Sequence, residues 1–342
     1  LSGVLPAEPD IVQFGKVPTL SMKLAINEGQ LSHARILEQL VASEGETRSV
    51  KVAENNLPQR ITRWIIAVAL FIAVLIPVVG RKMTAPLPNV QNELVIQRAT
   101  LPIQVGIESL PTEANILIAF DYQPGLYGEM SAAASGMVDH LLRKNAKLAY
   151  MSTEPTGSGL ARRFFSDTQT DTQHNHAAQL EQFSTDLGYL AGGTAGLQLL
   201  AQNPIGAMPA LNTSPNLPGF GTVNDLNYFH MIVVVTDDAD TARAWIEQVQ
   251  PRLNGTPLHM VVSAQAEPLV SPYFESDPKQ IDGLIAGAAG GAVYEQGSSF
   301  HIARKYWNPY STGVSVALLV IIAGGAYSLV QFFITRLRER DT

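Results

Sequence analysis

Two long runs without a charged residue enclose a central segment of mixed polarity. They extend from Trp64 to Gly80 and from Val314 to Ile334. A helix rises about 1.5 Å per residue, so roughly 20 apolar residues cross a hydrocarbon core of about 30 Å. The second run has this length, and the first reaches it when the residues from Ile61 are included. The pattern therefore predicts transmembrane helices over 61–80 and 313–334.

Between these runs, short apolar stretches alternate with segments of helical periodicity. Strands are expected at 115–121, 148–152, 229–236 and 259–263, and helices at 128–145, 157–168, 177–186, 193–202, 240–253 and 277–292. Such alternation is typical of a parallel sheet with helices on both faces. We therefore expect an α/β domain over 113–305, with a Rossmann-like, doubly wound and mainly parallel sheet inserted between the two transmembrane helices.

The segments that flank the first apolar run have weaker patterns. Residues 1–60 contain one helical stretch, 32–43, and are interpreted as an arm that a partner orders. Residues 81–112 contain four prolines, so we expect an extended linker there, with short extended pieces at ELVIQ and LPIQVGI.

Positive charge beside the apolar runs favours one topology. Basic residues flank the two runs on the side of the termini, and they are Arg60, Arg63, Arg336, Arg338 and Arg340. The opposite side has slightly fewer, namely Arg81, Lys82, Arg304 and Lys305. The positive-inside rule then places both termini in the cytoplasm, including a basic tail at 335–342, and the central domain outside it.

Composition excludes several chemistries. The chain has no cysteine, so disulfides, thiolate metal sites and a cysteine nucleophile are excluded. The net charge is −7, and residues 81–310 carry 13 Lys and Arg against 21 Asp and Glu. An acidic domain without a basic run is a poor nucleic-acid binder, so we expect no nucleic-acid partner.

Polar residues that follow the expected strands are the main candidates for a ligand site. In doubly wound sheets, ligands bind beyond the carboxyl ends of the strands. The candidates at this edge, together with an acid early in the next helix, are Asp121, Tyr122, Glu129, Thr153, Glu154 and Asp237. Acids at strand ends also cap the following helix, which is the structural alternative for Asp237. Asp121 is the strongest single candidate.

Two further motifs have weaker support. Gly192, Gly193 and Gly196 form a glycine-rich loop that lacks the Lys-Ser/Thr of a phosphate-binding loop, so a tight turn or close helix packing is favoured over ligand binding. His174 and His176 lie in a polar stretch, where solvated histidines are favoured over metal ligands. We therefore expect no metal, no cofactor and no assignable catalytic residue.

Three motifs carry a resemblance to a known group of proteins. They are FDYQPGLYGEM (120–130), STEPTGSGLARRF (152–164) and DLGYLAGGTAGL (186–197). They resemble uncharacterised bacterial membrane proteins with two spans and a central α/β domain. The resemblance implies a bacterial membrane setting and adds weight to Asp121, Glu129 and the glycine loop, but it implies no activity.

These patterns favour a non-enzymatic role. The first hypothesis is an accessory or scaffold subunit in the bacterial cell membrane, whose extracytoplasmic domain binds other membrane-protein subunits. The second is a membrane-tethered domain that binds or senses a ligand. The third is a hydrolase or transferase with its site at the carboxyl ends of the strands.

Overall fold

The computed structural model describes residues 28–45, 57–79, 93–169, 177–213, 223, 225–296 and 301–338. The chain divides into two units, residues 1–60 and residues 61–342, and each is described by itself. The first unit contains helix α1, Glu28–Gly45, which confirms the helix expected at 32–43. All other elements below belong to the second unit, except that α2 begins just before residue 61.

A six-stranded sheet forms the centre of the second unit, and every neighbouring pair of strands is parallel. The strands are β1 (Asn115–Asp121), β2 (Lys147–Ser152), β3 (Ser184–Tyr189), β4 (Met231–Thr236), β5 (Leu258–Val262) and β6 (Gly283–Ala286). Their order in the sheet is β3-β2-β1-β4-β5-β6, so the direction of winding reverses between β1 and β4. The expected α/β fold with a doubly wound, parallel sheet is confirmed.

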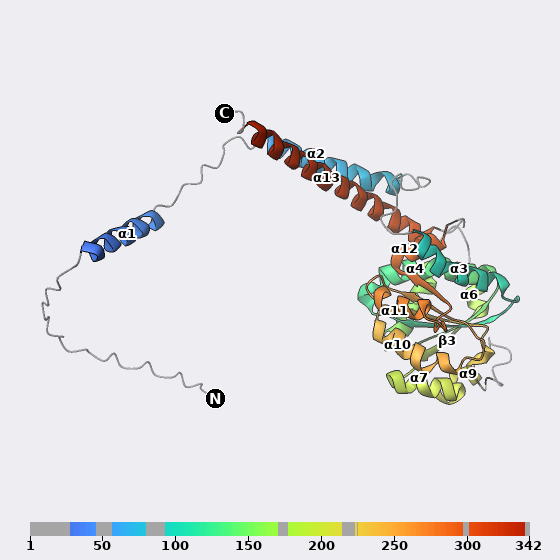
Figure 1. Ribbon diagram of the computed structural model, residues 1–342. Helices are drawn as coiled ribbons and strands as arrows, with labels where there is room; N and C mark the ends of the chain where they lie inside the picture. The colour runs from blue at the N-terminus through green and yellow to red at the C-terminus, as the bar shows by residue number, and fades with distance from the viewer. Residues whose placement is uncertain are drawn as a thin grey trace, which may run out of the picture. The chain divides into compact units, whose positions relative to one another are not determined.

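Helices cover both faces of this sheet (Figure 1). They are α3 (Glu93–Ser109), α4 (Tyr127–Arg143), α5 (Gly157–Gln169), α6 (Ala177–Phe183), α7 (Gly193–Gln202), α8 (Pro204–Ala207), α9 (Ala210–Thr213), α10 (Ala239–Gln248), α11 (Glu267–Glu275) and α12 (Gly287–Tyr294). One core lies under α7, α10 and α11, and the other lies under α3, α4 and α5. The strand residues alternate between these cores, since side chains along a strand point to opposite faces.

Three sequence predictions for this domain were wrong. The helix expected at 177–186 ends at Phe183, and its last residues begin edge strand β3, whose sequence STDLGY lacks an apolar run. The helix expected at 277–292 contains β6 and α12 instead, separated at Gly287, where φ is +55°.

The third error concerns the expected linker 81–112, because its second half forms helix α3 rather than extended pieces. Ile103 and Ile107 are four residues apart, face the sheet and are fully buried. Pro102 lies inside this helix, where a proline removes one backbone hydrogen bond. Burial of the apolar face outweighs that loss, so α3 is part of the domain core.

One described helix is long and apolar enough to cross a membrane. It is the stretch Ile302–Val330 of α13, which extends from Ile302 to Arg338. The apolar part of α2 (Leu57–Val79) covers Ile61–Ile76 and is shorter. α2 meets α13 where Val74 lies against Gly313. The transmembrane span expected at 61–80 therefore stays a prediction.

Helix α13 begins inside the α/β domain. The carboxylate of Glu295, which follows α12, accepts hydrogen bonds from the backbone N–H groups of Ala303 (2.9 Å) and Arg304 (3.0 Å). Glu295 is completely buried, as is Ala303. Two glycines make room for this joint, because a Cβ on Gly136 of α4 would lie 2.7 Å from Glu295 Cγ and one on Gly291 of α12 would lie 2.9 Å from Ala303 Cβ.

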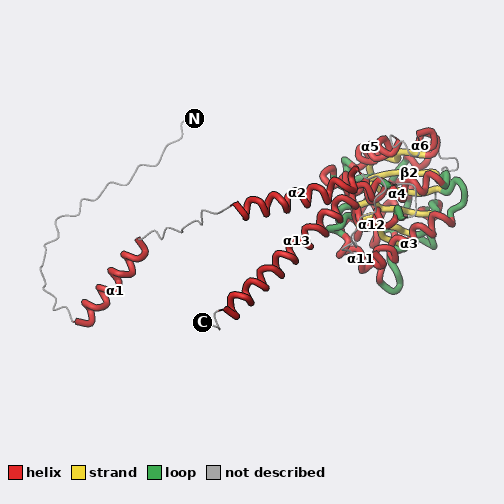
Figure 2. The backbone as a smooth tube through the Cα atoms, turned by 90° about the horizontal axis from the view of Figure 1, so that it is seen from above, coloured by secondary structure: helices red, strands yellow, loops and turns green. Residues whose placement is uncertain are grey.

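The direction of α13 follows from these contacts. α12 begins at the carboxyl end of β6 and runs back along the sheet. Ala303 packs in one cluster with Ala292, near the end of α12, and Trp307 packs on that cluster together with Ala288, near its start. α13 therefore runs in the direction of the strands, and it leaves the domain at one end of them (Figure 2). The carboxyl edge of the sheet faces the same way as the apolar part of α13.

The buried joint makes stability depend on pH. Burial raises the pKa of Glu295 from 4.5 to about 7. The folded chain then binds more protons than the unfolded chain between about pH 4.5 and about pH 7, so the free energy of unfolding falls as pH rises through this window. The full fall is about 3 kcal/mol.

We expect Glu295→Gln to remove this slope when unfolding of the full chain in detergent is followed from acidic to mildly alkaline pH. Glu247→Gln is the matched control, because Glu247 is exposed on α10. Equal slopes in the chain and in Glu295→Gln would contradict this role of the buried carboxyl group.

Candidate functional site

The candidate site lies where the winding of the sheet reverses, at the carboxyl ends of β1 and β4. Ligands of doubly wound proteins bind in the crevice at this point. The structure places all six predicted ligand residues on this edge, since they follow β1, β2 and β4 or lie in the first turn of α4. They are Asp121, Tyr122, Glu129, Thr153, Glu154 and Asp237.

Asp121 is buried and holds three elements together. Its Oδ2 accepts a hydrogen bond from Trp245 Nε1 on α10 at 2.7 Å. Its Oδ1 accepts bonds from the backbone N–H of Thr153 at 2.6 Å and from the hydroxyl of Ser152 at 3.1 Å. Its side chain is part of a residue that is only 1% exposed. Both carboxylate oxygens therefore bond groups of this chain, which gives Asp121 a structural role in joining β1, β2 and α10.

The close approach of α5 to this edge depends on a glycine. Gly157 begins α5, and a Cβ at this position would overlap the hydroxyl of Ser152 and the carbonyl oxygen of Phe120. Ser152 in turn donates a hydrogen bond to that carbonyl at 2.7 Å. The motif STEPTGSG is thereby explained as a tight strand-to-helix turn.

Two other predicted acids fix loops at this edge. Glu129 Oε1 accepts a hydrogen bond from the backbone N–H of Ala264, after β5, at 2.8 Å. Asp237 Oδ2 accepts one from the backbone N–H of Gln123, after β1, at 3.2 Å. The first bond joins the first turn of α4 to the loop after β5, and the second joins the residues after β4 to those after β1. These acids therefore hold the loops of the edge in fixed positions.

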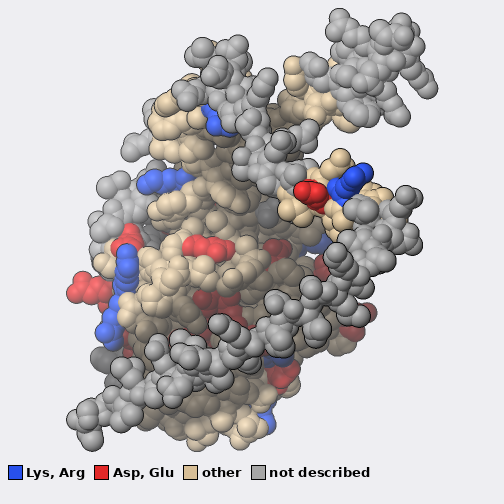
Figure 3. Space-filling view, turned by 90° about the vertical axis from the view of Figure 1, so that its left-hand side faces the viewer, with Lys and Arg blue, Asp and Glu red and all other residues tan. Residues whose placement is uncertain are grey.

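Glu154 and Asp237 are in an electrostatically crowded environment. Desolvation, followed by the carboxylates of Asp121, Asp237 and Asp238, raises the pKa of Glu154. Desolvation also raises the pKa of Asp237, with further contributions from Asp238 and Glu129. Acidic side chains are visible on one face of the domain in Figure 3. This edge disfavours phosphate and other anions, and it favours cationic groups.

Tyr122 is nearly completely buried at the start of the loop after β1. Its ring packs at 6.3 Å from Phe120 and at 6.4 Å from Tyr127, measured between centroids. Its hydroxyl has no hydrogen-bond partner among the described residues. The pKa of the hydroxyl is raised, chiefly by burial. Tyr122 thus belongs to the aromatic core under α4 and α5.

The glycine loop follows the carboxyl end of edge strand β3, which lies two strands away from β1 in the sheet. Gly192 and Gly193 have φ values of +102° and +53°, which favour glycine. A Cβ on Gly196 would overlap the carbonyl oxygen of Ala191. The turn into α7 therefore requires these residues, and their binding of a ligand stays a prediction. His174 and His176 lie outside the described residues. Within the described part of the chain, no three His, Asp or Glu side chains form a metal-binding group.

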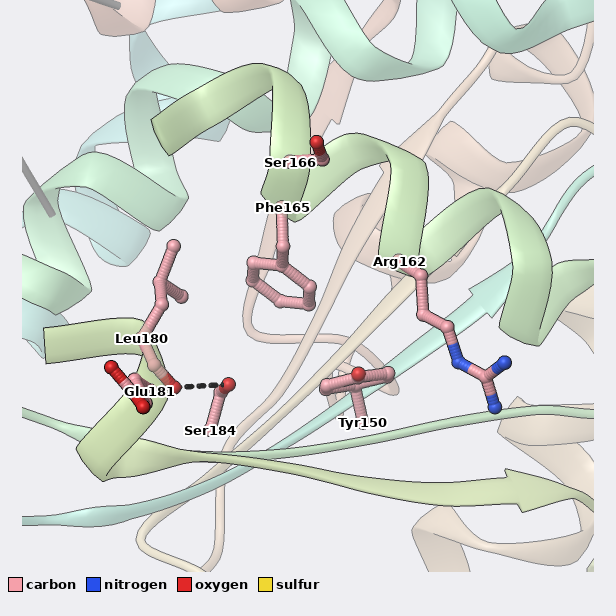
Figure 4. Close-up of a pocket in the computed structure, with 7 residues that line it drawn as sticks. All are labelled: Tyr150, Arg162, Phe165, Ser166, Leu180, Glu181 and Ser184. Atoms are coloured by element: carbon pink, nitrogen blue, oxygen red, sulfur yellow. Dashed lines mark hydrogen bonds between the residues drawn. The ribbon is translucent and has the colours of Figure 1, made fainter. Parts of the chain in front are cut away.

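Sequence reasoning missed an open cavity of about 440 Å³ beside β2 and β3. Its lining residues come from β2, α5, α6 and β3, and they are Tyr150, Arg162, Phe165, Ser166, Leu180, Glu181 and Ser184. Figure 4 shows Phe165 pointing into the space between Leu180 and Tyr150, with Arg162 at one side. Arg162 forms an ion pair with Asp186 at 2.7 Å. No local motif joins these residues, because two helices and two strands bring them together.

Comparison with protein-family models, with curated proteins and with solved structures finds no match for this chain.

The structural role of Asp121 has a direct test. In Asp121→Asn, a side-chain N–H₂ replaces one carboxylate oxygen. It then faces a group that donates a hydrogen bond to that oxygen in the unsubstituted chain. We expect the free energy of unfolding to fall by about 2–3 kcal/mol, measured by chemical denaturation of the full chain.

Asp240→Asn is the control, because Asp240 is 81% exposed and pairs with Arg243 at the surface. Its effect is expected to stay below about 0.5 kcal/mol. If Asp121→Asn is as stable as the unsubstituted chain, the structural role is contradicted and Asp121 is again a candidate for ligand binding.

Proposed function

We propose that this protein is a membrane-anchored accessory or scaffold subunit, whose α/β domain binds partner subunits at the surface of a bacterial cell membrane. One observation carries the proposal. The described helix that is apolar enough to cross a membrane is capped inside the domain by buried Glu295. A domain joined in this way keeps a fixed orientation and distance relative to the bilayer.

Interfacial residues of α13 support a short distance between domain and bilayer. Tyr306 and Tyr310 are exposed, and Trp307 packs at 5.5 Å from Tyr310 between ring centroids. Aromatic rings of this kind prefer the headgroup region. Ala303 is only seven residues before Tyr310, which is about 10 Å along a helix. A scaffold fixed so close to the bilayer is well placed to contact membrane-embedded subunits.

The topology completes the proposal but rests on sequence. We place both termini in the cytoplasm and the α/β domain outside it, with α2 as the first span, because basic residues are slightly more frequent on the side of the termini. The lipid bilayer and other membrane-protein subunits are the proposed partners.

A ligand-binding or sensory domain is the second candidate, and the cavity between β2, β3 and α5 favours it. The cavity combines an Arg162 guanidinium with the hydroxyls of Ser166 and Ser184 and the apolar side chains of Phe165 and Leu180. That combination fits a small ligand with an acidic group and an apolar part. The third candidate, a hydrolase or transferase, would use Glu154 and Asp237, whose pKa values are raised.

Mild-detergent extraction from native membranes tests the scaffold function. We expect other membrane proteins to co-purify with this chain in fixed stoichiometry, as measured by native mass spectrometry. A chain that is extracted alone, at several detergent concentrations, would contradict the proposal.

Thermal unfolding of the full chain with a panel of small organic acids tests the second candidate. The scaffold function predicts no shift in melting temperature. A shift that Arg162→Ala removes and Arg163→Ala keeps would favour the ligand-binding domain instead, because Arg163 lies one residue away and does not line the cavity.

A further inference from the structure

Helix α3 exposes a line of side chains on the outside of the domain, in which three are large and apolar and two, Arg98 and Glu108, are charged. The line follows residues 94, 98, 101, 105 and 108, whose spacing of four and three places them on one face of a helix. Leu94 is 75% exposed, Leu101 49% and Val105 59%. Val95 beside them is also exposed. Large apolar side chains aligned in this way on a surface mark an interaction site more often than single exposed ones do.

The line points along the direction in which α13 leaves the domain. The C-terminal end of α3 is fixed at the amino edge of the sheet, because Glu108 accepts a bond from the ring of His140 at 2.9 Å in the last turn of α4. The opposite end of α3, with Leu94, therefore lies toward the carboxyl edge. This is the edge that faces the apolar part of α13. The exposed line thus begins at the membrane-facing side of the domain and extends away from it.

A partner that covers the whole line must be elongated in the same direction. A lipid surface reaches only the end near Leu94, since Leu101 and Val105 are roughly 10 and 16 Å further along the helix. A helix that rises out of the membrane beside α3 covers all of it. α13 of this chain provides an example of such packing, because it rises from the membrane-facing side and packs on α12 and α4.

The charges within the line argue against a second copy of this chain. Two copies in one membrane are related by an axis along its normal, so their α3 helices run parallel. Arg98 would then face Arg98 of the other copy in the middle of the seam, and like charges there disfavour pairing. An antiparallel pair would place the α13 helices of the two copies in opposite directions. A helix of a different protein avoids both conflicts.

We infer that α3 is the docking surface for a helix of a partner membrane protein, which continues out of the bilayer beside α3. This helix carries apolar residues opposite Leu94, Leu101 and Val105 and an acidic residue opposite Arg98. The inference rests on the proposed scaffold function and adds to it the surface and the kind of partner.

Photo-crosslinking in native membranes tests this inference. A photoreactive amino acid replaces Leu101 or Val105 in the full chain, and the control replaces Leu269. Leu269 is 62% exposed and lies on α11, which covers the opposite face of the sheet. We expect crosslinks from the α3 positions to a co-purifying membrane protein, on a peptide next to one of its transmembrane helices, and none from Leu269.

Charged substitutions provide the second readout. Leu101→Glu and Val105→Glu should each lower the amount of co-purifying partner about tenfold, since one buried charge costs at least 1.4 kcal/mol at such a seam. Leu269→Glu should leave it unchanged. Arg98→Glu should lower it as well, because it reverses the charge that faces the partner.

The outcomes separate this inference from the proposed function. A partner can co-purify in an amount that the α3 substitutions do not change and form crosslinks only at other surfaces. That result would overturn the inference and leave the scaffold function intact. Crosslinks to a second copy or to lipid only would also overturn it. Absence of any partner with the unsubstituted chain would overturn the proposed function and the inference together.

Discussion

A buried carboxylate connects the α/β domain of this protein to helix α13. Glu295 follows α12 and caps the first turn of α13, and glycines in α4 and α12 let the helices come close enough to enclose it. The contacts fix where α13 leaves the domain and in which direction. Because α13 is also the described helix that is apolar enough to cross a membrane, we propose that the same contacts set the orientation of the sheet relative to the bilayer.

That orientation gives the carboxyl edge of the sheet a different meaning from the one it has in soluble doubly wound proteins. The crevice at the reversal point normally receives a diffusing ligand. Here the acids that line it bond neighbouring loops, as Glu129 does with Ala264 and Asp237 does with Gln123. The edge is acidic and fixed, and in the proposed membrane-anchored arrangement it is directed toward the bilayer, while the exposed apolar side chains of α3 lie at the side. Such a distribution suits a scaffold that contacts membrane-embedded partners.

Much of the fold could be predicted from the sequence, and the exceptions have physical reasons. Strands β1, β2, β4 and β5 were predicted because buried parallel strands are nearly continuous apolar runs. Edge strand β3 lacks an apolar run and β6 has only four residues, so the hydrophobic pattern does not distinguish either strand from the neighbouring segments. Helix α3 contains Pro102 and follows further prolines, and its helical form depends on burial of Ile103 and Ile107 against the sheet.

The sequence predicted where the candidate residues lie better than it predicted what they do. The sequence placed Asp121 at the carboxyl edge, but its partner Trp245 is 124 residues away and no local pattern connects the two. The cavity beside Tyr150 and Arg162 was missed for the same reason, since separate elements supply its walls. The role of Glu295 was also missed, because a cap formed eight residues before its helix N–H partner has no recognisable spacing.

The orientation of the domain on the bilayer is the central claim, and the absence of cysteine from the chain makes it directly measurable. Single cysteines replace Gln265, at the carboxyl edge, and Asn254, at the amino edge, and each carries a fluorophore in the full chain reconstituted into vesicles. Quenching by lipids with nitroxide headgroups should be strong at position 265 and weak at position 254. Equal quenching, or stronger quenching at position 254, would show that the carboxyl edge does not face the membrane.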